Sequence, residues 1–208
     1  MKRIFSLILA IALALASITI FSGCNEEPKD LYFTQKSDGT YMFSQCSNRI
    51  VGDFEIPATY NGAAVTEIER AAFIANAGLI SVVVPEGVEI IGNSAFSSCF
   101  SLERVVLPST VKSIGVCAFA SCRKLKEIKI PDGVTEIADE TFEFCTELAS
   151  VEPPASLTRI GNKAFYACVG LKTIKYGGTE EQWAEIVKGA EWDYTAESYT
   201  VIYNYANQ

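Results

Sequence analysis

The chain has 208 residues, 49% of them hydrophobic, and a formal net charge of −8. This length and apolar content fit one ordinary domain or one elongated repeat array, and they exclude a disordered chain. The acidic balance argues against nucleic acid as a partner, because binding a phosphate backbone requires clustered positive charge.

Residues 1–23 have the pattern of a secretory signal. Lys2 and Arg3 precede an uncharged, mainly apolar run over residues 4–20, which ends in the sequence FSGC. The run is also long enough to cross a bilayer as a retained helix, but no cluster of basic stop-transfer residues follows it. The ending resembles a bacterial lipoprotein signal, with phenylalanine at position 21 where leucine is commonest. The resemblance implies acylation of Cys24, which would anchor the protein to a membrane without spanning it.

Residues 24–30 form a short acidic tether. Once Lys2 and Arg3 leave with the signal, 15 basic and 25 acidic residues remain, a net charge of −10. The acidic residues after Cys24 resemble the surface-export signal of some gut bacterial lipoproteins, and a solvated spacer would explain them equally well. We expect an exported, lipid-anchored protein of the cell envelope that is displayed at its surface.

Residues 31–64 predict a β cap in front of the repeats. Aromatic-rich runs over residues 32–35 and 40–43 flank an Asp-Gly pair, which supplies the positive φ of a tight hairpin. A further short strand is expected over residues 53–56, and the sequence TYNG (59–62) makes the next turn. Such a cap is needed because the first coil of a repeat stack would otherwise expose apolar surface.

Residues 65–179 repeat one 23-residue pattern five times without an insertion. Each coil carries five apolar anchors, which in the second coil are Val88, Ile91, Phe96, Leu102 and Val105. A period of this length with this many anchors lies in the range of leucine-rich repeats, in which each coil buries its anchors against its neighbours.

Within one coil the pattern predicts strand, turn, helical turn and strand. Residues 88–91 form the first short strand, and Gly92 follows where the chain must bend. The three-residue spacing of Phe96, Cys99 and Leu102 favours a single helical or 3-10 turn. The second strand, residues 104–107, stops at a proline.

The repeated phrase VEIIGNSAFSSCFSLERVVLP (88–108) resembles the BspA-like subclass of leucine-rich repeats. The sequence TYNG leading into VTEI (65–68) resembles that family's N-terminal entry, and the likeness covers residues 56–178. It implies a leucine-rich-repeat solenoid of short β-strands with helical or 3-10 turns. Members of the family are secreted or surface proteins of bacteria and some parasites, implicated in adhesion, and no fixed residue motif carries that adhesion.

Residues 180–208 predict a C-terminal cap of one helix and one strand. A capping box over residues 179–182 begins the helix, and Lys188 followed by Gly189 indicates its end, so we expect a helix from 180 to 188. Its apolar stripe, expected to seal the last coil, consists of Trp183, Ile186 and Val187. Alternating residues predict the final strand; they are Tyr199, Val201, Tyr203 and Tyr205.

The sequence contains no histidine, which removes imidazole bases, Ser-His-Asp triads and histidine-bound metals. Glu140 and Glu143 are paired carboxylates in principle, but they occupy variable positions of a coil, where exposed charge is ordinary. We therefore expect no enzyme, and neither a cofactor nor a metal.

One cysteine per coil recurs at the repeat spacing; these residues are Cys99, Cys122, Cys145 and Cys168. A ladder of this kind spreads the sulfurs along the stack, whereas a thiolate metal site needs them to converge on one point. Adjacent rungs come within reach of a disulfide in an exported protein, but free buried thiols are favoured because cysteine is a small apolar filler. Cys117 lies off the ladder and is expected to be more exposed, and Cys46 has no obvious partner.

Three aromatic residues stand where the other coils have smaller or polar residues; they are Phe100, Phe144 and Tyr166. Solenoids present long faces lined by variable positions, and aromatic side chains often anchor protein interfaces. These three are candidate partner-binding residues, and filling of local grooves on the convex side is the alternative.

The sequence therefore predicts a non-catalytic protein-binding or adhesion module, held to the membrane through Cys24. Its expected partner is a protein on a host or neighbouring cell. The alternative is a structural role, as a spacer or assembly subunit of an envelope complex.

Overall fold

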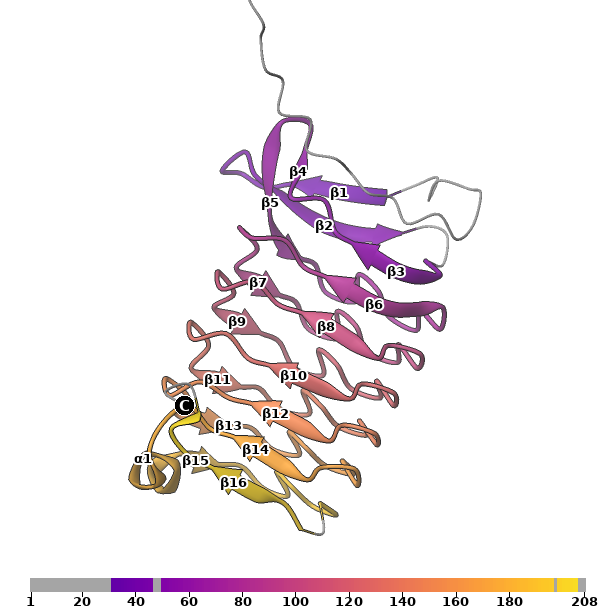
Figure 1. The fold of residues 1–208 in the computed structure, drawn as a ribbon. Helices are drawn as coiled ribbons and strands as arrows, with labels where there is room; N and C mark the ends of the chain where they lie inside the picture. The colour runs from indigo at the N-terminus through magenta and orange to yellow at the C-terminus, as the bar shows by residue number, and fades with distance from the viewer. Residues whose placement is uncertain (1–30, 47–49, 197, 206–208) are drawn as a thin grey trace, which may run out of the picture.

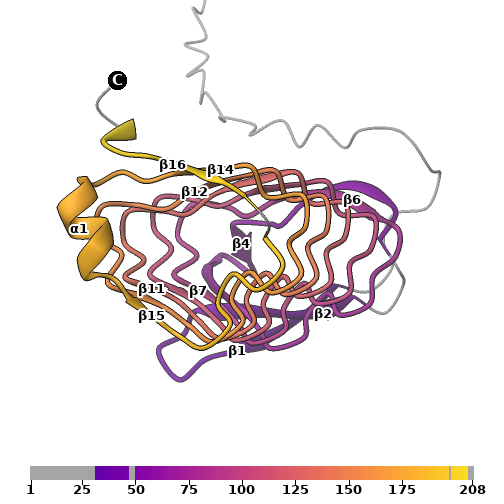
Figure 2. The same ribbon diagram turned by 90° about the horizontal axis from the view of Figure 1, so that it is seen from below.

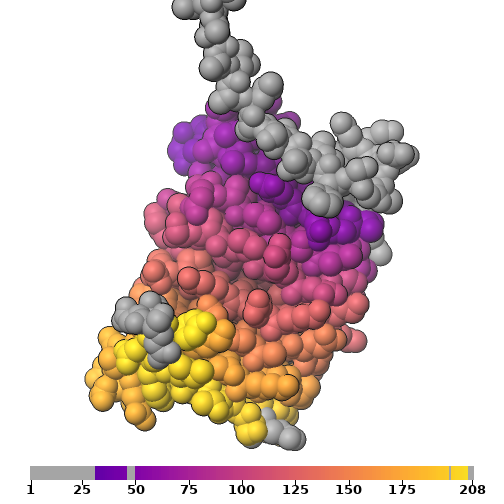
Figure 3. Space-filling view, viewed as in Figure 1, coloured from indigo at the N-terminus to yellow at the C-terminus, as the bar shows by residue number. Residues whose placement is uncertain are grey.

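The computed structural model describes residues 31–46, 50–196 and 198–205. These residues wind into a flattened β-solenoid whose coils lie one on another along the stack (Figures 1 and 3). Viewed along the stack, a long sheet forms one broad face, and short strands with turns form the opposite face (Figure 2). The predicted leucine-rich-repeat solenoid is confirmed. The signal, the tether and Cys24 lie outside the described residues.

The long sheet contains seven strands in the order β16-β14-β12-β10-β8-β6-β3. They are β3 (Gly52–Glu55), β6 (Leu79–Val83), β8 (Arg104–Val106), β10 (Glu127–Lys129), β12 (Ser150–Glu152), β14 (Thr173–Lys175) and β16 (Thr200–Ile202). All neighbours are parallel, and Val82 pairs with Val105 as Ile128 pairs with Val151. The register therefore equals the sequence period, so that each buried anchor meets its own counterpart.

The opposite face carries mostly two-residue strands. They are β5 (Ala63–Ile68), β7 (Ile90–Ile91), β9 (Ser113–Ile114), β11 (Glu136–Ile137), β13 (Arg159–Ile160) and β15 (Val187–Lys188). Strands β5, β7 and β9 pair in parallel, as do β11, β13 and β15.

The predicted N-terminal β cap is confirmed. Strands β1 (Leu31–Gln35) and β2 (Tyr41–Cys46) form an antiparallel hairpin, and β2 continues in parallel register with β5. Strand β4 (Thr59–Tyr60) folds back antiparallel on β5. The Phe43 ring stacks on Phe73 of the first coil at a centroid distance of 4.8 Å, so the hairpin extends the core while it covers the end of the stack.

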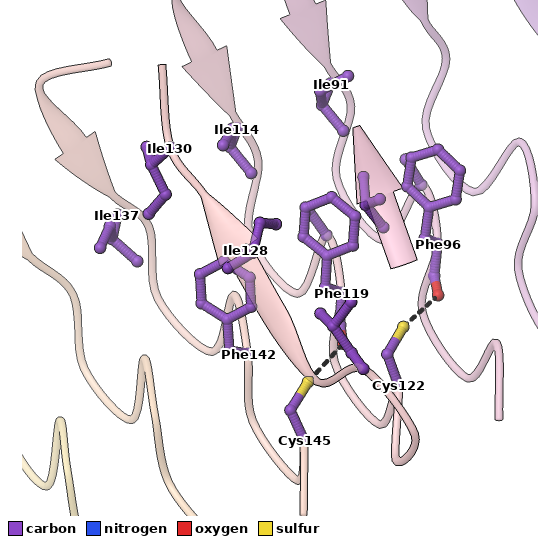
Figure 4. Close-up of a cluster of buried hydrophobic side chains, with 14 of the residues drawn as sticks. Ile91, Phe96, Ile114, Phe119, Cys122, Ile128, Ile130, Ile137, Phe142 and Cys145 are labelled. Carbon is purple, nitrogen blue, oxygen red and sulfur yellow. Dashed lines mark hydrogen bonds between the residues drawn. The ribbon is translucent and has the colours of Figure 1, made fainter. Parts of the chain in front are cut away.

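A column of phenylalanine rings forms the centre of the core (Figure 4). Successive centroids are 4.9–5.6 Å apart and the ring planes differ by at most 12°; the residues are Phe73, Phe96, Phe119, Phe142 and Phe165. None is more than 2% exposed. Burying one such side chain contributes about 1.5–3 kcal/mol, and every coil contributes one.

The turn segment contains the expected 3-10-type hydrogen bonds but does not form a helix. The Cys99 N–H donates to Phe96 O and the Leu102 N–H to Cys99 O, each across three residues. Ser94 and Ser98, however, have φ of +56° and +62°. These left-handed residues direct the N–H groups of Ser94, Phe96 and Ser98 to carbonyl groups of the next coil. The same two positions are left-handed in every coil, and hydrogen bonds between coils replace those of a helix.

The predicted C-terminal helix ends earlier than expected. Helix α1 (Glu180–Glu185) begins with the predicted capping box, but Val187 and Lys188 belong to β15 and pair with β13. The Val187 N–H donates to Thr158 O, so pairing with the preceding coil ends the helix before its predicted last turn. Val187 is consequently 63% exposed and does not help to seal the core, whereas Ile186 is buried.

The chain after α1 forms a further, divergent coil. A Cβ atom at Gly189 would lie 2.5 Å from Asn162 N, just as one at Gly161 would lie 2.5 Å from Asp139 N, so Gly189 is a bend glycine rather than a helix stop. Lys163 and Ala167 donate their N–H groups to carbonyl groups of this coil. The five predicted repeats are present, and the caps continue the long sheet at both ends. Only Thr200–Ile202 of the predicted final strand is β-structure.

Phe119→Ala tests the phenylalanine column. Phe119 is fully buried between two rings, so we expect its loss to lower the free energy of unfolding by about 3–5 kcal/mol in urea denaturation. Phe100→Ala is the matched control, because Phe100 is 41% exposed, and we expect it to cost less than about 1 kcal/mol. Equal losses in the two variants would contradict the assigned core.

Candidate binding surface

The repeated cysteines belong to the core. Each thiol is buried and donates a hydrogen bond to the phenylalanine carbonyl group of the preceding coil, as Cys122 does to Phe96 O at 3.2 Å and Cys145 to Phe119 O at 3.1 Å (Figure 4). All four are free cysteines. Burial raises the pKa of the Cys99 and Cys168 thiols to about 12, so they stay protonated at neutral pH. The ladder is scaffold.

Cys117 is more exposed than the ladder cysteines, as expected. Its thiol donates to the Glu140 carboxylate at 3.2 Å, and burial together with that carboxylate raises its pKa to about 12. A high thiol pKa makes Cys117 a poor nucleophile. Within the ranges that the structure describes, no three cysteine, aspartate or glutamate side chains are grouped as metal ligands, and no helix is long and apolar enough to cross a membrane.

The part of the chain that the structure describes has shallow surface depressions. One, of about 260 Å³, lies on the long sheet and is lined by residues 104–107, 127–129 and 152. Another, of about 230 Å³, lies between α1 and the last coils and includes Tyr176 and Ile186. Neither contains any of the three aromatic residues singled out from the sequence.

Two of those three aromatics meet in space. The rings of Phe144 and Tyr166 are edge-to-face with centroids 5.7 Å apart, and Tyr166 stacks on Tyr194 at 5.4 Å. Phe144 is 43% and Tyr194 56% exposed. We call these three residues the aromatic strip; it runs over three successive coils on the turn-bearing face. Phe100 is not part of it, because it lies two coils away with the Arg123 guanidinium 5.2 Å from its ring centroid.

The sequence alone does not single out Tyr194, because the pattern after Gly178 predicts a cap and not a further coil. Ala167 donates its N–H to Tyr194 O, and this bond places Tyr194 at the Tyr166 position of the next coil. The available signal was Gly189, which stands five residues before Tyr194 as Gly161 stands five residues before Tyr166. The helix insertion shifts this coil out of the 23-residue period.

Phe144 occupies a position that does not favour a large side chain. Its φ is +58°, a left-handed conformation that is uncommon for residues with a bulky side chain. The other repeats place alanine or serine there, namely Ala75, Ser98, Ser121 and Ala167. Since Phe144 is exposed, burial in the core does not account for this choice.

Charged groups flank the aromatic strip. Lys163 Nζ lies 5.5 Å from the Tyr166 ring centroid and 3.9 Å from the Glu191 carboxylate. On the coil before, Glu140 and Glu143 stand beside Phe144, and burial followed by the Glu140 charge raises the pKa of the Glu143 carboxyl. The strip is therefore bordered by more acidic than basic groups.

Comparison with known proteins identifies the repeats. A scan of protein-family models finds six copies of the BspA type leucine rich repeat region over residues 66–185. A search of curated proteins finds no match. Among solved structures, the chain is similar to a leucine rich cell surface protein from Faecalibacterium prausnitzii A2-165, with 34% identity and a TM-score of 0.70 over 76% of this chain. This chain covers only 41% of that protein.

The chain is also similar to a leucine rich repeat protein of T. pallidum, with 24% identity and a TM-score of 0.69. The match covers 86% of this chain and 84% of that one. It shows that the fold is shared along nearly the whole length of both proteins.

Thiol titration tests the cysteine ladder. In a background with Cys24 and Cys46 replaced by serine, we expect the folded protein at pH 8 to react with less than about half an equivalent of an aromatic disulfide reagent within minutes, because a thiol of pKa about 12 is almost fully protonated there. Unfolding in urea should release all five remaining thiols. Rapid reaction of several thiols in the folded state would contradict their placement.

Proposed function

Because the chain belongs to the BspA-type leucine-rich repeat family, we propose that it is a non-catalytic module that binds proteins at a bacterial cell surface. The 34% identical protein from F. prausnitzii is described as a leucine rich cell surface protein. A solenoid suits this task, since its coils hold side chains at fixed spacing on long faces.

The exposed aromatic strip is the observation that carries the proposal. Aromatic side chains that are rigidly held and surrounded by polar groups contribute most of the free energy in many protein interfaces. Phe144 and Tyr166 are held by turns whose N–H groups are bonded to the next coil, so little conformational freedom is lost on binding. Phe100 forms a second, separate contact point in this proposal.

We also propose that acylated Cys24 anchors the mature chain, with residues 24–30 as a tether to the cap and repeats. The support is the sequence alone: an apolar run that ends in a small residue and a cysteine. Two or more acyl chains bind a bilayer stably because each buried methylene contributes about 0.8 kcal/mol. The binding surface would then be displayed outside the membrane.

Substitution of the strip tests partner binding. Partners are first identified by cross-linking in intact cells, and their affinity is then measured for Phe144→Ala and Tyr166→Ala. We expect at least about tenfold weaker binding, which corresponds to about 1.4 kcal/mol, with an unchanged melting temperature.

Ser121→Ala, which alters the Phe144 position one coil earlier, serves as the control and should bind normally. Unchanged affinity of both aromatic variants would show that this edge does not bind the partner. Cross-links to envelope proteins alone would favour the alternative role as a spacer or assembly subunit.

Metabolic labelling with a fatty acid tests the anchor. We expect the wild-type protein to incorporate label and to fractionate with membranes, and Cys24→Ala to lose both properties because its side chain cannot be acylated. Label that persists in Cys24→Ala would contradict this site.

A further inference from the structure

Glu140 and Glu143 lack the basic partner that several other acidic side chains of the repeats have. In those pairs a lysine or arginine one coil away neutralises the carboxylate, as Lys112 does for Glu89 at 2.8 Å and Lys126 for Glu103 at 2.7 Å. In the part of the chain that the structure describes, no ion pair includes Glu140 or Glu143.

The surroundings of the two carboxylates favour the approach of a positively charged group. Partial burial of Glu143 and then the nearby Glu140 charge raise the pKa of the Glu143 carboxyl, and the charge of Lys163 offsets this only in part. Among the described residues, the one hydrogen bond that the Glu140 side chain accepts is the weak thiol bond of Cys117. The nearest strip cation, Lys163, lies over the Tyr166 ring and is paired with Glu191.

Phe144, next to Glu143 in the chain, is exposed, so an apolar surface lies beside carboxylates that form no ion pair in the described residues. A lysine or arginine side chain matches this combination, because its methylene stem packs on an aromatic face while its charged end reaches a carboxylate. A neutral glycan would use the rings but would leave the two carboxylates unpaired.

We propose that the aromatic strip, with Glu140 and Glu143, binds an extended segment of a protein partner in which lysine or arginine lies next to apolar residues. This inference rests on the proposed function and specifies its partner class. The apolar residues of the segment contact Tyr166 and Tyr194, and its basic residue lies between Phe144 and the two carboxylates. The overall charge of the mature chain, −10, further attracts such a segment.

The probes are three labelled ten-residue peptides, measured by fluorescence anisotropy against the mature chain at 0.15 M salt. The first alternates lysine with leucine, the second replaces every lysine with glutamate, and the third replaces every leucine with serine. We expect the first to bind at least tenfold more tightly than either of the others, because binding needs both the charge and the apolar contacts.

Glu140→Gln combined with Glu143→Gln removes the charges and leaves the rings intact. We expect this double variant to bind the first peptide at least tenfold more weakly and with less dependence on salt. Glu127→Gln combined with Asp132→Asn is the matched control, since it removes two exposed carboxylates away from the strip. It should bind like the wild type.

Equal weakening in the control variant would overturn the inference, because it would show attraction to net charge alone. Equal affinity for the lysine and glutamate peptides would overturn it as well. If Phe144→Ala abolishes capture of a cross-linked partner while the double glutamine variant does not, the proposed function stands and the basic segment is wrong. If a neutral oligosaccharide binds and its binding needs Phe144 but neither carboxylate, the inference of a basic segment is also wrong.

Discussion

Register between neighbouring coils is the constraint on which the rest of the structure depends. Each coil pairs with the one 23 residues earlier through two sets of short parallel strands, and the turn segments add N–H donors at alternate residues. A residue inserted within a paired segment would move the neighbouring anchors off their counterparts, whereas the insertion of α1 is tolerated because it lies between paired segments. This explains why the phenylalanine column and the cysteine ladder repeat so strictly, and why the residues between them are free to vary.

The described residues divide accordingly into scaffold and variable surface. Cys122 and Cys145 recur because their thiols fill the core and donate to a carbonyl group of the coil before. Phe144 is different, because the other repeats have alanine or serine at this left-handed position and because its ring remains exposed. This difference between Phe144 and its counterparts in the other repeats identifies the surface on which binding is proposed.

Much of this fold could be predicted from the sequence, because the anchors of the repeat are local and periodic. The hairpin was predictable from Asp38-Gly39, and the start of α1 from its capping box. The end of α1 was not predictable in this way, since pairing of Val187 with the preceding coil, rather than helix propensity, decides it. The left-handed turn residues could not be predicted for a similar reason. Serine, glutamate and phenylalanine do not favour positive φ, and the hydrogen bonds between coils impose this conformation.

The candidate site was predictable only in part. Comparison of the coils identified Phe144 and Tyr166, but their contact with each other and with Tyr194 depends on the divergent last coil. Glu140 and Glu143 could be identified as acidic residues in the sequence, but not as part of a site. Whether a basic side chain lies near enough to pair with them depends on the fold.

Hydrogen–deuterium exchange of residues 24–208 with a cross-link-identified partner tests the central claim most directly. The account predicts that the partner slows exchange in the turn segments 140–147, 163–169 and 191–195, where the aromatic strip lies. Protection confined to the long-sheet strands β8, β10 and β12 would contradict it, because binding would then take place on the opposite face.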